Sequence, residues 1–161
     1  INIINQKFKE IGLKNTQINN LLPDLDGTNI TSTKDLSLIL ALVDNGYILK
    51  VHSRDIFREI MGSSKTNTLI LSGILKGLGK KSNDTDYQLS LKGFSVLNKT
   101  GDIGISYSDT ALIQTPQNSR VFASFIVKGP FNDPRSTELI RNLSAELVPF
   151  LALDQKSLNT H

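Results

Sequence analysis

The sequence predicts an α+β fold in which helices come first, a three-stranded antiparallel meander follows, and a C-terminal helix covers the sheet. Two observations carry this prediction. Up to about residue 79 the apolar residues recur at the spacing of amphipathic helices, whereas residues 94–128 form β-rich runs broken by short turns. A last helical pattern follows Asp133. We therefore expect one domain over residues 1–161.

The composition is that of an ordinary globular protein and argues against several classes of site. The net charge is only +3 and the basic residues are scattered, which argues against nucleic acid as a partner. The chain has no cysteine, and its two histidines, His52 and His161, lie far apart, so we expect no metal site. No phosphate-loop or other cofactor motif is complete, and no cofactor is expected. We find neither a signal peptide nor an apolar run of the ~18 residues that cross a bilayer.

The first predicted element is a short amphipathic helix that ends near Gly12 and Asn15. Its apolar face is formed by Ile3, Ile4, Phe8 and Ile11. Residues 15–30 follow and are rich in Asn, Asp and Gly, with one proline. They are predicted to form a long ordered loop, and loops of this length in a compact domain usually have a function.

Three further helices are predicted before the sheet. The first begins at Ser32, which has capping-box spacing to Asp35, and stops at Gly46. The second has Ser53 as its N-cap and Gly62 as its terminator. The third is shorter, within residues 66–79, and its end is marked by Gly73, Gly77 and Gly79.

The remaining elements follow a polar, irregular stretch over residues 80–92, which we interpret as an insertion or hairpin. Three β-rich runs are predicted as consecutive antiparallel strands over residues 94–103, 106–115 and 120–128. Asp133 and Pro134 then begin a terminal helix. Its expected sheet-facing stripe consists of Leu139, Ile140, Leu143, Leu147 and Phe150.

A Lys-Thr-Gly sequence at residues 99–101 stands in the first of these strands, and this order of elements resembles the final third of a class A β-lactamase or a penicillin-binding protein. Residues 21–29, 31–36 and 53–61 precede it in the order of that family, so the resemblance covers nearly the whole chain. It implies that the chain is the C-terminal portion of a single β-lactamase/transpeptidase-like domain. A family of this kind acts through a serine that attacks a β-lactam or D-Ala-D-Ala carbonyl and forms an acyl-enzyme.

The resemblance also implies roles for four residues. Lys99 keeps the site electropositive, and the Thr100 hydroxyl binds the carboxylate of the substrate. Gly101 leaves room for the acyl chain beside the strand. The backbone N–H of Asp102 is one of two donors to the oxyanion, an interaction that can be worth ~3 kcal/mol in the transition state.

The predicted loop departs from the β-lactamase pattern at one position. Class A β-lactamases have a glutamate before the proline of this loop, which activates the water that hydrolyses the acyl-enzyme. Here Leu22 precedes Pro23. Asp24 and Asp26 are nearby carboxylates, but neither occupies the base position, and we interpret them as solvated or turn-capping residues. Leu22 is expected to pack against apolar neighbours. The pattern is similar to penicillin-binding DD-peptidases, which acylate and then release penicillin slowly.

Two motifs of the family are absent from these residues. There is no Ser-x-x-Lys sequence, and the only Ser-x-Asn match, at residues 157–159, follows the last helix and is read as coincidence. We therefore expect a missing N-terminal segment as partner, and no acyl transfer by this chain alone.

These observations leave two classes of function. The first is part of a DD-peptidase that acts on peptidoglycan stem peptides and is trapped by β-lactams, with a serine β-lactamase as the enzymatic alternative. The second is a non-catalytic relative that binds cell-wall peptide or a protein partner through the Lys-Thr-Gly edge. The resemblance implies an extracytoplasmic location in either case.

Overall fold

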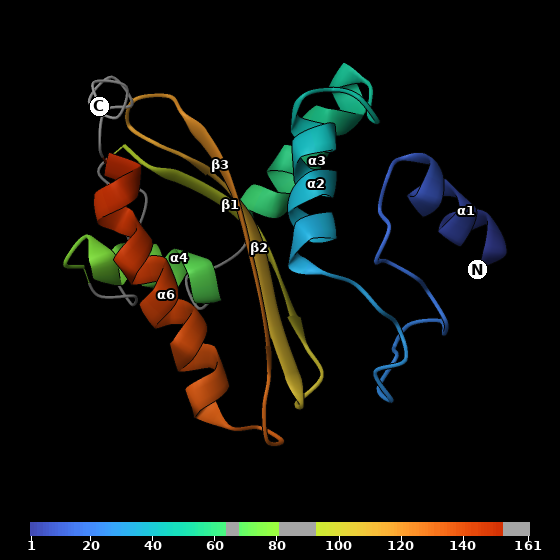
Figure 1. Cartoon of the computed structure of the whole chain (residues 1–161). Coiled ribbons are helices and arrows are strands. Elements are labelled where there is room, and N and C mark those ends of the chain that lie inside the picture. The colour runs from blue at the N-terminus through green and yellow to red at the C-terminus, as the bar shows by residue number, and fades with distance from the viewer. Residues whose placement is uncertain (64–67, 81–92, 153–161) are drawn as a thin grey trace, which may run out of the picture.

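The three β-rich runs form one antiparallel sheet in the order β1-β2-β3. Figure 1 shows the computed structural model, which describes residues 1–63, 68–80 and 93–152. The strands are β1 (Ser95–Asp102), β2 (Ser106–Gln114) and β3 (Arg120–Lys128), so the three predicted runs are confirmed to within one residue at each end. Gly104 makes the β1–β2 turn with a φ of 78°, a conformation that glycine adopts without strain.

Helices cover both faces of this sheet (Figure 1). One face carries α4 (Leu69–Gly77) and α6 (Pro134–Ala152), and the other carries α2 (Thr33–Asp44) and α3 (Val51–Gly62). Helix α1 (Asn2–Glu10) lies beyond α2, on the side away from the sheet. The predicted α+β class, with a C-terminal helix over the sheet, is confirmed. None of the described helices has the length and apolar character needed to span a bilayer.

The core lies between the sheet and the α4–α6 layer. Its members are apolar side chains of α4, β2 and α6 that are almost completely withdrawn from solvent: Ile70, Leu71, Ile74, Leu75, Ala111, Ile113 and Ile140. Burial of this set stabilises the layer by about 1.5–3 kcal/mol for each large side chain. The core between the sheet and the α4–α6 pair therefore holds β1 in place.

The buried face of α6 differs from the predicted stripe. Of the five residues expected on the sheet, Ile140 is fully buried, but Leu139 and Leu143 are nearly half exposed and Phe150 is 70% exposed. The residues that are buried recur every fourth position and include two serines: Ser136, Ile140, Ser144 and Val148. Small side chains replace large ones on this face because α6 comes very close to the backbone of α4.

Gly73 and Gly77 explain this close approach, since they are one turn apart and both face α6. The prediction of helix-end markers is wrong for Gly73, which lies inside α4, and is confirmed for Gly77, which is its last residue. A Cβ on Gly73 would lie 2.5 Å from Ser144 Cβ, and one on Gly77 would lie 2.6 Å from the carbonyl oxygen of Ala145. Gly79, with a φ of 73°, follows the C-cap residue and also belongs to the helix end.

Gly77→Ala is therefore expected to destabilise the protein. The added methyl group would meet a backbone oxygen and Val148 Cγ2, both at 2.6 Å, and neither can move without shifting α6. Overpacking of this kind costs about 1–3 kcal/mol. The gain in helix propensity is smaller than the roughly 1 kcal/mol of a helix interior, because Gly77 is the last residue of α4. The free energy of unfolding, measured in urea, should fall. An unchanged unfolding midpoint would mean that the two helices are not in such close contact.

The predicted helix ends are confirmed at one helix and wrong at the next. Ser32 caps α2 by accepting the N–H of Asp35 at 3.2 Å. Helix α3, however, starts at Val51 with Lys50 as N-cap, so Ser53 lies within the first turn. Gly62 is the last residue of α3, but the next residue is right-handed helical. Gly62 is instead a contact position, because a Cβ there would lie 3.1 Å from Leu97.

Three sequence predictions lie outside the described residues. They are the hairpin proposed for residues 80–92, of which only Lys80 is described, the Ser-x-Asn match at residues 157–159, and His161.

The described sheet has two open edges, because β1 and β3 are both terminal strands. Open edges offer unpaired main-chain groups to other strands. Exposed apolar side chains lie on α6 and also on α1, where Ile1, Ile3 and Ile4 are at least 46% exposed. Both features favour association with another polypeptide.

The chain by itself is therefore expected to self-associate and to bind an exposed-apolar dye. Light scattering and dye fluorescence would measure the two effects. Replacing Leu139, Leu143 and Phe150 together by glutamate should reduce dye binding, because these side chains supply an exposed row on α6. A monodisperse monomer without dye binding would show that these surfaces do not drive association.

Candidate active site

The open edge of β1 carries the main-chain groups of Thr100 and Asp102. The Ile103 N–H donates to the Ser106 carbonyl at 3.2 Å, and antiparallel pairing alternates from that pair along the strand. Lys99 and Gly101 therefore bond to β2, whereas the N–H and C=O groups of Thr100 and Asp102 point away from it. The Thr100 carbonyl accepts the Lys99 ammonium at 2.6 Å on this open side.

Strand alternation places Lys99 and Thr100 on opposite faces. Lys99 and Gly101 share the face toward α2, while Thr100 shares the face of Asn98, which is fully buried toward α4. The two residues thus reach a common ligand only along the strand edge. A ligand that used both would lie beside β1 rather than on either face of the sheet.

A cleft of about 360 Å³, here called the inner cleft, opens between β1 and the helices α2 and α3. Its sheet side is formed by Lys99, Thr100, Gly101, Ser108 and Thr110. Its helical side is apolar and consists of Leu36, Ile39, Leu40, Val43, Phe57 and Met61. The side chains of Lys99, Ser108 and Thr110 thus stand at the polar side of an otherwise apolar space, whereas the side chain of Thr100 belongs to the opposite face of the strand.

A second cleft of about 570 Å³, here called the loop cleft, lies between the loop before α2 and the β1–β2 turn. Leu22 and Asp24 line it from the loop, and Gly101, Asp102 and Ser108 line it from the sheet. Gly101 and Ser108 belong to both clefts, so the clefts meet there. The structure thus brings Leu22 and the Lys-Thr-Gly strand to one continuous groove.

Ser108 is a groove residue that the sequence analysis missed. It is the cross-strand partner of Gly101, and a Cβ on Gly101 would lie 2.6 Å from the Ser108 hydroxyl. Glycine at 101 therefore leaves the Ser108 hydroxyl in its place, in addition to any space that it leaves for a ligand. The register of the β1–β2 hairpin is the signal that could have identified Ser108.

The β1–β2 turn is held from two sides. The Asp102 carboxylate accepts the Gly104 N–H at 2.7 Å, so its side chain is engaged within the turn. The chain after β3 adds bonds from the Gly129 N–H to Ile105 and from the Asn132 N–H to Gly104. Burial raises the pKa of Tyr107, and the charges of Asp102 and Asp133 raise it further. The hydrogen bonds at Gly104 and Ile105 fix the end of β1, where the Asp102 N–H points to the open edge.

The loop of residues 15–31 is ordered by its own polar side chains. Gln17 and Ile30 form a β-bridge that closes it. The Asn29 side chain accepts the N–H groups of Asn19 and Asn20 at 2.7 and 2.9 Å. At its base, the Asp35 carboxylate of α2 accepts the Asn15 N–H at 2.6 Å. The predicted ordered loop is confirmed.

Leu22 does not pack against apolar neighbours as expected. Its side chain is 85% exposed, beside a cis peptide bond to Pro23, and it lines the loop cleft. The groove therefore contains a solvent-accessible hydrocarbon at the position before the proline.

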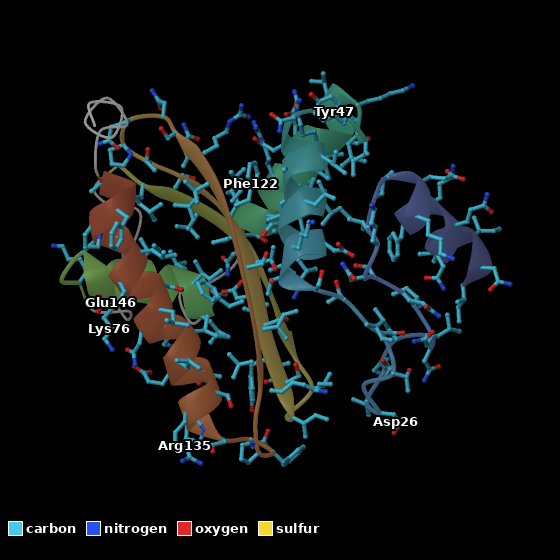
Figure 2. The ribbon with its side chains drawn as sticks, viewed as in Figure 1. Asp26, Tyr47, Lys76, Phe122, Arg135 and Glu146 are labelled. Carbon is cyan, nitrogen blue, oxygen red and sulfur yellow. The ribbon has the colours of Figure 1, made fainter. Side chains whose placement is uncertain are left out.

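The two aspartates of the loop differ in their surroundings. The Asp24 carboxylate is buried and accepts the Thr28 hydroxyl at 2.8 Å and the Asn29 N–H at 2.6 Å. The Asn29 N–H holds the pKa of Asp24 below its usual range. Asp26 is exposed and lies at the tip of the loop (Figure 2). Asp24 thus holds the loop together, and Asp26 lines neither cleft.

Acid is expected to loosen this loop through Asp24. Because the folded pKa is below the ordinary value of 3.8, the stabilisation is present at neutral pH and is lost as the pH falls below that value. Asp24→Asn should reproduce the effect at pH 7, raising the exchange rate of the Asn29 amide about tenfold, the effect of losing one hydrogen bond. Asp26→Asn is the matched control and should change nothing. Equal exchange in both variants would contradict the assignment.

Within the described ranges, no three His, Cys, Asp or Glu side chains gather as a metal site would require. His52 is exposed on α3, away from the groove.

The family model described as the beta-lactamase enzyme family matches residues 1–151. Among solved structures, PBP-A is 40% identical, with a TM-score of 0.77, over 91% of this chain and 49% of its own. A leucine-to-glutamate mutant of PBP-A, in an acyl-enzyme complex with penicillin G, is 39% identical with a TM-score of 0.77, over 91% of this chain and 50% of that chain.

A class A beta-lactamase from Bacteroides cellulosilyticus shares the fold at 16% identity, with a TM-score of 0.66 over 94% of this chain and 53% of its own. No curated protein matches the chain. The chain spans about half the length of the solved relatives. The match over residues 1–151 and the likeness to PBP-A show that the chain belongs to the beta-lactamase enzyme family.

Proposed function

We propose that the chain is the C-terminal part of a penicillin-binding serine DD-peptidase, a D-Ala-D-Ala carboxypeptidase or transpeptidase of peptidoglycan metabolism. Such a protein is acylated by β-lactams and deacylates slowly. The observation that carries the proposal is the position of Leu22, which lines the groove opposite Gly101 and Asp102 and cannot accept a proton. The identity to PBP-A, whose mutant forms an acyl-enzyme with penicillin G, supports it.

The proposed reaction needs a serine that this chain does not provide. We assign it to an N-terminal segment with a Ser-x-x-Lys sequence, and we call a polypeptide that contains both parts the joined protein. The serine oxygen would bond to the carbonyl carbon of the substrate, the C–N bond of the peptide or lactam would break, and the serine proton would pass to the leaving nitrogen. The reaction would take place outside the cytoplasmic membrane, where peptidoglycan is cross-linked.

The open edge of β1 would bind the substrate during this step. An acyl chain lying alongside β1 could pair with the outward main-chain groups of Thr100 and Asp102. The Asp102 N–H would donate to the oxyanion, the Thr100 hydroxyl would bind the substrate carboxylate, and Lys99 would supply positive charge. Ser108 adds a second hydroxyl at the junction of the two clefts.

The slow second step would follow from the loop. Hydrolysis of the acyl-enzyme requires a base that removes a proton from water. Leu22 is no base, Asp24 is engaged by Thr28 and Asn29, and Asp26 lies at the tip of the loop. Within the described residues no carboxylate of the loop is free to act at the groove.

Intact-mass measurement of the joined protein with penicillin tests the proposal. We expect an adduct with the mass of the whole penicillin that persists through many minutes, and no adduct on the chain alone. Rapid return of the free protein with consumption of penicillin would instead indicate a β-lactamase. No adduct under any condition would indicate a non-catalytic relative.

A further inference from the structure

Asn98 and Asp109 form a buried polar pair on the sheet face opposite Lys99. Both side chains have no exposed surface. The Asn98 amide Nδ2 donates to both carboxylate oxygens of Asp109, each at 3.0 Å. The Ile70 N–H, in the first turn of α4, donates to Asp109 at 2.7 Å. One carboxylate therefore connects β1, β2 and the start of α4.

A contact to the amide oxygen of Asn98 also comes from the start of α4. The hydroxyl of Thr68, the N-cap residue of α4, donates to the Asn98 amide oxygen at 3.5 Å. The amide of Asn98 thus has a defined orientation, with its nitrogen toward Asp109 and its oxygen toward Thr68. Both members are held from two directions.

Burying this polar pair in the core has an unfavourable free energy of desolvation. The pair lies against the apolar core of α4 and β2, and burial raises the pKa of Asp109 although the bonds from Ile70 and Asn98 oppose that rise. A well-packed apolar pair would stabilise such a site as well or better. A buried polar pair instead fixes the relative position of the strands that carry it, because its hydrogen bonds are satisfied in one register only.

The location of the pair shows which part of β1 it would orient. Asn98 immediately precedes Lys99 in β1, and Asp109 is the cross-strand partner of Thr100. The pair is diagonal across the two strands, directly beneath the segment whose edge faces the groove. A shift or rotation of β1 at this point would move the Lys99 side chain and the outward groups of Thr100 and Asp102 together.

We propose that Asn98 and Asp109 are a positioning pair that sets the orientation of residues 99–102 at the open edge of β1. The inference rests on the proposed function of that edge. Neither residue lies where a ligand in the groove could touch it, since both face α4. They act through the strand and are not catalytic residues.

An exchange of the two residues tests the pair in the joined protein. Asn98→Asp places two carboxylates against each other, and Asp109→Asn places two amides there with one oxygen for two donors. Each single variant is expected to slow acylation by penicillin about tenfold or more. In the double variant Asn98→Asp with Asp109→Asn, the amide nitrogen at 109 can donate to the carboxylate at 98 while its oxygen still accepts the Ile70 N–H, so one bond of the pair and the bonds to α4 can form again. Acylation should therefore be clearly faster than in either single variant.

A second measurement separates positioning from stability. Gly77→Ala perturbs the far end of α4 and is the matched control, expected to lower the melting temperature without slowing acylation. Amide exchange at Lys99 and Gly101, whose N–H groups bond to β2, should rise in the single variants and fall back toward the parental rate in the double variant.

The outcomes are distinct. Single variants that melt earlier but acylate at the parental rate would overturn the inference, as would a double variant that remains as slow as the single ones. If the parent itself is not acylated, the proposed function fails. The exchange rates at Lys99 and Gly101 then decide whether the pair orients the strand.

Discussion

Lys99→Ala in the joined protein is expected to slow acylation by penicillin about 10²-fold or more, with little change in stability. The side chain is exposed and lines the inner cleft beside the open edge of β1, so its removal leaves no cavity in the core. Under the proposed function, a cation at this place would stabilise the negative charge that develops on the substrate, and the loss of one such contact has an effect of this size. The measurement is the second-order rate constant of acylation, followed by intact mass.

Two variants serve as controls for this result. Lys128→Ala removes a cation that lines the loop cleft from the end of β3, and it should leave acylation almost unchanged. Lys99→Arg keeps the charge in a larger planar group and should recover part of the rate. An equal loss in the Lys99 and Lys128 variants would show that only the general positive field matters. Equal rates for Lys99→Ala and the parent would remove the role assigned to Lys99.

The sheet could be predicted almost to the residue because its signals are local. Runs of β-forming residues and turn residues such as Gly104 stand next to one another in the sequence, and each strand pairs with the next. The same holds for the Ser32 cap, whose partner Asp35 is three residues away. Features that depend on neighbouring positions can be read from the sequence.

The buried face of α6 could not be predicted because it depends on a distant helix. By apolar pattern alone, Leu139, Leu143 and Phe150 belong inside. The glycines of α4, more than 60 residues earlier, bring the two backbones together, and Gly73 meets the small side chain of Ser144 at the contact. Small residues that allow close packing are not strongly hydrophobic. A search for apolar residues at helical spacing therefore does not identify the face that they occupy as buried.

Part of the groove was predicted from one strand and one loop. Its remaining residues could be identified only once the register of the strands was known. The Lys-Thr-Gly sequence and Leu22 were identified by resemblance, and their roles stay predictions. Ser108 and Asp109 lie in a run of three consecutive polar residues, 108–110, which by itself indicates a solvated segment. Only the pairing of β1 with β2 places Ser108 against Gly101 and buries Asp109 beside Asn98.

Leu22→Glu in the joined protein is expected to shorten the lifetime of the penicilloyl adduct, since a positioned base contributes ~10²–10⁴-fold to such a step. The exposure of Leu22 favours this result. A glutamate there would remain in contact with solvent and would keep an ordinary acidity, so it would be ionised at neutral pH. The Asp24 bonds that hold the loop would be untouched, because they involve Thr28 and Asn29.

The comparison with two other variants decides whether position or charge is responsible. Leu22→Gln has the same shape without a base and should keep the long lifetime. Leu25→Glu adds a carboxylate at another exposed leucine of the loop, three residues further on, and should also keep it. A shorter lifetime in Leu22→Glu alone would identify residue 22 as the position that separates slow from fast deacylation. If all three variants retain the parental lifetime and a native fold, residue 22 does not face the acyl carbonyl, and slow deacylation must have another cause.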